Sequence, residues 1–213
     1  EEVTCYLAKV PHKRANSTFK ILLDMALNPR LKERDIQKEK TVIIEEIKMY
    51  KDLPQHMVQE LLDEAMWPKH PLGRNISGEI GSVSSISKNN LMIFKDKYYR
   101  PQNMVIVFVG NVKHNDCLDF INTNLKTDRF TAQDYSFDKF ISKQKQPFIK
   151  TLFKDIKQTN LAIGFPAYER THPKRFILIL LTIILGGNMS SRLFNKVREK
   201  HGLAYAISSN YKR

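Results

Sequence analysis

The hydrophobic positions of this 213-residue chain follow two spacings that alternate along the sequence. Apolar residues three and four apart predict amphipathic helices, whereas continuous runs of β-branched and aromatic residues predict strands. Helical spacing covers residues 15–27, 33–51, 55–67, 87–98, 115–125, 173–185 and 188–200, and strand-like runs cover residues 3–10, 104–109, 148–156, 159–165 and 203–210. Because helices alternate with strands and hairpin-like neighbours also occur, the pattern predicts an α+β fold.

One polar stretch shows neither spacing. Residues 127–146 predict a linker between a first domain, residues 1–126, and a second domain that begins at residues 147–213. The chain is long enough for two small domains. It starts at Glu1, and its last strand-like run has nothing after it. We therefore expect a piece of a longer protein, with both domains incomplete.

The composition is that of a globular protein, with 42% hydrophobic and 27% charged residues. The net charge is +13, and residues 141–213 carry most of it, with 14 Lys/Arg against three Asp/Glu. A basic region of this kind attracts acidic partners in some proteins. Here the cations are scattered among apolar residues without a nucleic-acid-binding module, so we expect no nucleic-acid partner.

The cysteines and the apolar runs indicate the compartment of the protein and whether it spans a membrane. Cys5 and Cys117 are far apart and form no C-x-x-C motif, which favours a reducing compartment over a disulfide framework. The most apolar run, residues 176–185, is too short to cross a bilayer. We expect no membrane span.

The helical run at residues 33–51 carries two carboxylates on its apolar side. Glu39 and Glu46 are seven residues apart, two helical turns, and both fall beside Ile43 on a helical wheel. A buried carboxylate without a partner is too costly to stay ionised. The partner would be a Lys or Arg, a hydrogen-bond network or a metal ion. Alternatively, the two groups form structural ion pairs, or the helix is rolled so that both reach water, and spacing alone leaves these alternatives open.

A second candidate lies where a helix is expected to meet a strand. Arg198 falls in the last turn of the run 188–200, where a cation also suits the helix dipole. Gly202 permits a sharp turn, and Tyr205 follows early in the next strand-like run. A guanidinium and a phenol presented together are suited to hold a peptide carbonyl or an oxyanion. Both residue types are also common at these positions for structural reasons alone.

Histidines add no complete metal site. The six histidines form neither H-x-x-E-H nor H-x-x-H, so each is expected at a surface or in a turn.

Several motifs occur together in a fixed order, and they span nearly the whole chain. They are Thr4-Cys-Tyr6, the helix Ile36 to Ile47 with Glu39 and Glu46, His70-Pro-Leu-Gly-Arg74, Tyr98-Tyr-x-Pro-x-Asn-Met104, Gly110-Asn-Val112, Ser191-Arg-Leu-Phe194 and Arg198-Glu-Lys-x-Gly-Leu-Ala-Tyr205. Together these segments resemble the pitrilysin/insulinase superfamily of zinc metallopeptidases, the inverzincins. The nearest branch is the one that includes mitochondrial processing peptidase and its bacterial relatives.

This resemblance implies a fold and a role for each candidate. The fold is the α+β metallopeptidase fold of the processing-peptidase type, an antiparallel-rich mixed sheet flanked by helices in two similar domains. Glu46 would be a ligand to one zinc ion, beside the two His of an H-x-x-E-H motif, and Glu39 would be the accessory catalytic carboxylate. Arg198 and Tyr205 would bind the substrate carbonyl.

The resemblance also implies an activity, with one departure. A zinc endopeptidase would hydrolyse peptides or small unfolded proteins by metal-activated water. The H-x-x-E-H motif is absent from these 213 residues, so we expect it upstream and expect the piece itself to be inactive. The alternative is a non-catalytic partner subunit of the same fold, acting in binding or assembly. Such subunits usually lose the ligand carboxylates, and the presence of both Glu39 and Glu46 argues against that alternative.

Partners and location are implied in the same way. Both candidate pairs stand in one chain, which predicts a homodimer in which one protomer's Arg198 and Tyr205 complete the other's zinc site. The expected location is the bacterial cytoplasm, with the mitochondrial matrix as the alternative.

Overall fold

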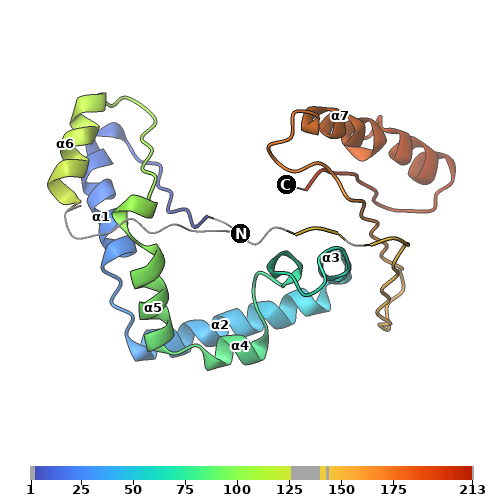
Figure 1. Ribbon diagram of the computed structural model, residues 1–213, viewed down its shortest axis with the longest axis horizontal. Coiled ribbons are helices and arrows are strands. Elements are labelled where there is room, and N and C mark those ends of the chain that lie inside the picture. The colour runs from blue at the N-terminus through green and yellow to red at the C-terminus, as the bar shows by residue number, and fades with distance from the viewer. Residues whose placement is uncertain (1–2, 126–139, 143, 213) are drawn as a thin grey trace. The chain divides into compact units, whose positions relative to one another are not determined.

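The chain folds into two compact units of helices joined by extended segments (Figure 1). The computed structural model describes residues 3–125, 140–142 and 144–212. The first unit comprises Glu1–Ile141 with Pro147–Leu161, and the second comprises Ser142–Gln146 with Ala162–Arg213. Most of the expected linker 127–146 lies outside the described residues, and the expected domain boundaries stay a prediction.

Among the described residues of the first unit, α-helices occur where the hydrophobic spacing predicts them, with one additional α-helix. The predicted helices are α1 (Ala15–Leu27), α2 (Glu33–Asp52), α3 (Pro54–Met66), α5 (Lys88–Tyr98) and α6 (His114–Asn124). The addition is the six-residue helix α4 (Ile80–Ser85). Ser87 caps the start of α5, because its hydroxyl accepts a hydrogen bond from the Asn90 backbone N–H at 3.1 Å.

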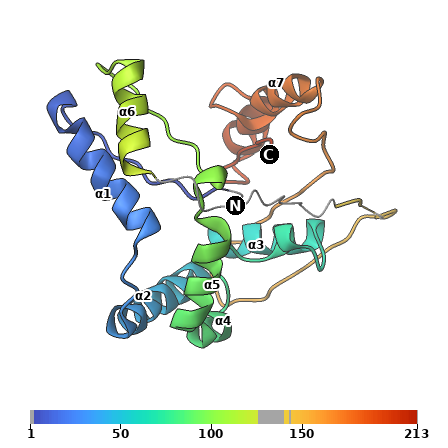
Figure 2. The ribbon, with the colours of Figure 1, turned by 60° about the vertical axis from the view of Figure 1, so that its left-hand side comes forward.

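A hydrophobic core joins α1 to α6 and to the extended segment before α6. The two helices lie side by side (Figure 2). Phe19, Leu23 and Leu125 are buried at the centre, and partly buried residues surround them: Leu27, Met104, Ile106, Phe108, Phe120 and Ile121. The Phe19 and Phe108 rings meet with their centroids 5.3 Å apart.

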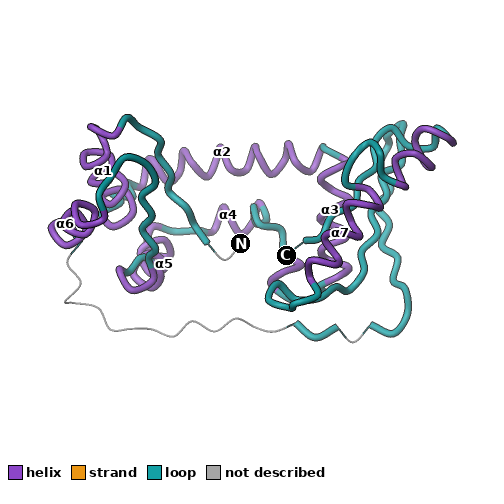
Figure 3. Tube along the Cα trace, turned by 90° about the horizontal axis from the view of Figure 1, so that it is seen from above, coloured by secondary structure: helices purple, strands orange, loops and turns teal. Residues whose placement is uncertain are grey.

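The predicted sheet is wrong for the described part of the chain. Every segment expected to be a strand is an extended loop there, and Figure 3 shows helices and loops alone in residues 3–125, 140–142 and 144–212. The run 104–109 explains the error. Val105, Val107 and Val109 are 90%, 74% and 93% exposed, while the alternate side chains pack against α1. Period-two alternation thus sets which face is buried, but a strand also needs a backbone partner, which the run lacks here.

The long helix α2 packs against both α3 and α4. Ile47 is its most buried side chain, at 1% exposed, and Ile36 is buried about three turns earlier. Polar contacts fix α4 beside it: the Lys40 ammonium donates to the Ser84 carbonyl oxygen at 2.9 Å. Lys51 also forms an ion pair with Glu79, which precedes α4, at 3.1 Å. These contacts determine which side of α2 faces solvent.

The second unit is built on α7 (Arg175–Gly186) and a π-helix (Phe194–Lys200). Chain beyond the π-helix returns to α7, where the Ser209 backbone N–H donates to the Gly186 carbonyl oxygen at 3.1 Å. The approach is so close that a Cβ atom added at Gly186 would lie 2.6 Å from the Ser209 nitrogen. A glycine is therefore required at the end of α7. No helix in the described part of the chain is long and apolar enough to cross a membrane.

Candidate functional site

Glu39 and Glu46 both lie on α2, and both are exposed. Val42, between them along the helix, is 46% exposed, whereas the buried stripe of α2 runs through Ile36 and Ile47. Of the alternatives that the spacing leaves open, the structure thus has the helix rolled so that both carboxylates reach water. Because both side chains are exposed, neither carboxylate is a buried charge that would need a partner in this structure.

Neither carboxylate has a hydrogen bond or an ion pair with any described residue. The neighbouring Glu45 differs, because its carboxylate pairs with the Lys48 ammonium at 2.8 Å. Lys40, one residue after Glu39, is engaged by the Ser84 carbonyl oxygen instead. Glu39 and Glu46 thus keep all their acceptor positions available, two turns apart on one side of a helix.

A metal ion is chemically compatible with these two groups but needs more ligands. Carboxylate oxygens bind Zn²⁺, which takes four ligands in proteins. Within residues 3–125, 140–142 and 144–212, no group of three or more His, Cys, Asp and Glu side chains is placed to hold a metal ion. By themselves, Glu39 and Glu46 therefore supply too few ligands to hold a zinc ion.

Arg198 and Tyr205 lie together in the second unit, as the spacing predicts. The Arg198 guanidinium carbon lies 5.8 Å from the centroid of the Tyr205 ring. It also lies 4.6 Å from the centroid of the Phe194 ring, a contact that the sequence analysis missed. The available signal was the four-residue spacing of Phe194 and Arg198, which brings side chains together on one helix face.

A turn at Gly202 brings Tyr205 back to Arg198. Gly202 has a φ of +59°, in the left-handed region that glycine adopts without strain. Its N–H donates to the Arg198 carbonyl oxygen at 2.9 Å, and the Leu203 N–H donates to the Val197 carbonyl oxygen at 3.0 Å. The expected turn is thus confirmed. The carboxylate pair and the Arg198/Tyr205 pair belong to different units.

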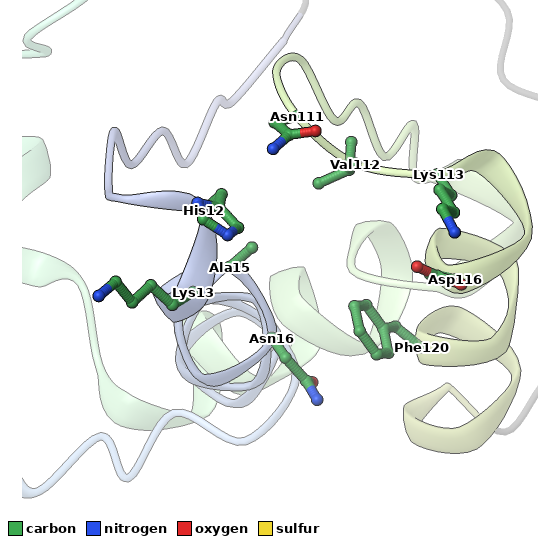
Figure 4. A pocket seen from close by; sticks show the side chains of 9 residues that line it. All are labelled: His12, Lys13, Ala15, Asn16, Asn111, Val112, Lys113, Asp116 and Phe120. Carbon is green, nitrogen blue, oxygen red and sulfur yellow. The ribbon is translucent and has the colours of Figure 1, made fainter.

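A cavity of about 310 Å³ opens between the starts of α1 and α6 (Figure 4). His12 and Phe120 line it from the two sides, and Lys113 and Asp116 lie on the α6 side, whereas the Lys13 side chain points away. No pattern in the sequence predicts this cavity. Its lining mixes cationic, anionic and apolar groups, so it favours no single class of ligand.

Two sequence profiles of one peptidase family cover the chain. Residues 1–79 match "Insulinase (Peptidase family M16)", and residues 85–213 match "Peptidase M16 inactive domain". The chain belongs to peptidase family M16. The resemblance to the pitrilysin/insulinase superfamily is thereby confirmed.

Relatives of this M16 chain include bacterial proteins named as zinc proteases. It is 35% identical over 212 residues to the uncharacterized zinc protease YmxG of Bacillus subtilis, covering 98% of this chain and 50% of the relative. It is 32% identical over 217 residues to an uncharacterized zinc protease of Rickettsia felis, with the same two coverages. The M16 chain thus spans about half the length of these curated relatives.

A solved structure shares the fold of the M16 chain. The crystal structure of a peptidase M16 inactive domain from Pseudomonas fluorescens superposes with a TM-score of 0.70 at 20% identity, over 94% of this chain and 48% of that one. At that identity the likeness supports the fold alone.

Proposed function

We propose that this chain is part of a zinc-dependent endopeptidase that hydrolyses peptides or small unfolded proteins. The observation that carries the proposal is the pair Glu39 and Glu46, two exposed carboxylates without partners among the described residues, two turns apart on one side of α2. Membership of a peptidase family and relatives named as zinc proteases support the same reaction class.

Each carboxylate has its own role in the proposal. Glu46 holds the zinc ion through a carboxylate oxygen, and Glu39 orients the groups around it and exchanges a proton with them. When bound, zinc supplies Lewis-acid chemistry that polarises a carbonyl and makes water a stronger nucleophile. The two His ligands belong, in this proposal, to chain outside these 213 residues, since the relatives are about twice as long.

Arg198 and Tyr205 serve the substrate in this proposal. A guanidinium and a phenolic hydroxyl both donate hydrogen bonds to the carbonyl oxygen of a bound peptide. Their contact within 5.8 Å, with Tyr205 86% exposed, leaves donors accessible to a peptide. Further parts of the proposal are a homodimer in which these residues complete the partner's zinc site, the absence of a nucleic-acid partner, and a cytoplasmic location.

The test is zinc retention by the full-length protein. Glu46→Gln removes the charged ligand oxygen, so we expect zinc affinity to fall at least about 10-fold, since even outer-shell changes cost that much. Metal analysis after dialysis against a weak chelator measures it. Glu45→Gln is the matched control, because Glu45 lies next to Glu46 on the same helix and pairs with Lys48 instead. Full zinc occupancy in Glu46→Gln would show that Glu46 is no ligand.

A second candidate is the non-catalytic partner subunit of the same fold, because residues 85–213 match the profile of an inactive domain. That function predicts a full-length protein that binds neither zinc nor a peptide for cleavage, yet associates with an active relative. Peptide turnover by the purified full-length protein, lost on chelation and restored by zinc, decides between the two.

A further inference from the structure

Two aromatic rings lie close to the guanidinium of Arg198. Its carbon atom lies 4.6 Å from the centroid of Phe194 and 5.8 Å from that of Tyr205. Phe194 is half-buried, whereas Tyr205 is 86% exposed. Phe194 is thus the nearer ring and the one held by the surrounding chain.

The ion pair of Arg198 with Glu199 constrains the guanidinium little. Its Nε lies 3.8 Å from a Glu199 carboxylate oxygen, and the two side chains are 39% and 59% exposed. Exposed pairs at such distances contribute almost nothing, because water screens them and both side chains lose entropy. A ring beneath a guanidinium acts differently, since it occupies the flat face and leaves the N–H groups at the edge free to donate.

We infer that Phe194 is a positioning residue, whose ring holds the Arg198 guanidinium edge-on toward a substrate carbonyl. The inference rests on the proposed function of Arg198 and adds to it the residue that orients the donor. Phe194 has no polar atom in its side chain, so its role is confined to the face of its ring. Phe194 and Arg198 stand four residues apart in the π-helix, so the backbone itself keeps ring and cation together. Single-turn π-helical segments frequently occur at functional sites.

The experiment compares steady-state kinetics of full-length variants on a fluorogenic peptide. Phe194→Leu removes the ring, and we expect KM to rise about fivefold, the worth of one exposed cation–π contact, with kcat and zinc content nearly unchanged. Phe194→Tyr keeps a ring face and should restore KM. Because Phe194 is half-buried, Phe194→Met is made in parallel to fill the volume with a flexible chain if the leucine variant fails to fold.

A matched control exists in the same unit. The Arg175 guanidinium carbon lies 4.4 Å from the centroid of the Phe176 ring, so Phe176→Leu breaks an equivalent contact away from Arg198. We expect it to leave KM unchanged.

A double-mutant cycle separates positioning from a merely structural role. In an Arg198→Ala background, Phe194→Leu should have no further effect on KM. An equal rise of KM in both backgrounds would overturn the inference, as would an unchanged KM in Phe194→Leu while Arg198→Ala raises it. If Arg198→Ala itself leaves KM unchanged, the proposed substrate role of Arg198 fails, and the role of Phe194 fails with it.

Discussion

The phenol of Tyr6 shows how one contact changes the chemistry of a side chain. Its hydroxyl lies 3.3 Å from the hydroxyl of Tyr99, and the rings meet edge to face with centroids 6.5 Å apart. The hydrogen bond to Tyr99, then burial, then the charge of Tyr99 raise the pKa of Tyr6 to about 12 from 10.0. All three favour the neutral phenol.

The raised pKa predicts a stability change at high pH. The folded state holds the Tyr6 proton more tightly than the unfolded chain does, so the contribution is complete below pH 10 and is lost as the pH rises toward 12. Tyr99→Phe removes the hydrogen bond, and we expect the pKa of Tyr6 to fall toward 10. Tyrosinate absorbance during an alkaline titration measures it, together with urea midpoints across the same range. Tyr168→Phe is the control, since Tyr168 is also 43% exposed but belongs to another unit. Equal alkaline titration in both variants and the natural chain would contradict the prediction.

Local sequence determines the helices of this chain more completely than it determines the extended segments. The spacing at residues 15–27 predicts α1 with both ends correct, and α2, α3, α5 and α6 agree within one residue at each end. A helix satisfies its backbone hydrogen bonds within itself, so a local pattern is sufficient. A strand needs a partner that no local pattern specifies, and the predicted sheet fails for that reason.

The candidate site also has features that local sequence determines and features that packing between elements determines. Gly202 and the four-residue contacts of Arg198 are local, and the turn was predictable. The orientation of α2 was not, because its contacts with α4 decide which side is buried. The helix α4 is short and rich in serine, so its spacing gave no helical signal. The helix α4 is stabilised by a capping box between Glu79 and Ser82. In a sequence, a capping box is a weaker signal of a helix than an apolar stripe.

The end of α7 carries a prediction about packing between elements. A Cβ atom at Gly186 would meet the Ser209 nitrogen at 2.6 Å and its Cβ at 2.8 Å, so Gly186→Ala must displace the returning chain. We expect a loss of about 1–3 kcal/mol in the free energy of unfolding, typical of overpacking. Urea denaturation measures it. Gly81→Ala within α4 is the control, because nothing lies within 4 Å of its new Cβ. There we expect no loss, since alanine is the better helix former. Equal stability of the two variants would show that the returning chain yields freely.

At the scale of the whole molecule, the proposed homodimer requires residues of two protomers to form one site. If Glu46 of one protomer acts with Arg198 of its partner, Glu46→Gln of the full-length protein has no turnover by itself, and Arg198→Ala has only weak turnover at peptide concentrations below its KM. Mixing Glu46→Gln with Arg198→Ala after partial unfolding and refolding would then create mixed dimers with one intact site each. Random pairing predicts recovery of roughly a quarter of wild-type turnover, because about half the dimers are mixed and each has one of two sites.

The control for complementation is the double variant, with both substitutions in one chain, mixed with either single variant. In the shared-site homodimer it restores nothing, since the Glu46 or the Arg198 that a site needs is always missing. If each site is instead built within one protomer, mixing the two single variants leaves every site damaged. Mixing then adds no turnover to that of the single variants. Turnover after mixing, read beside zinc content and the mass of the assembly, thus tests whether the two candidate pairs act across protomers.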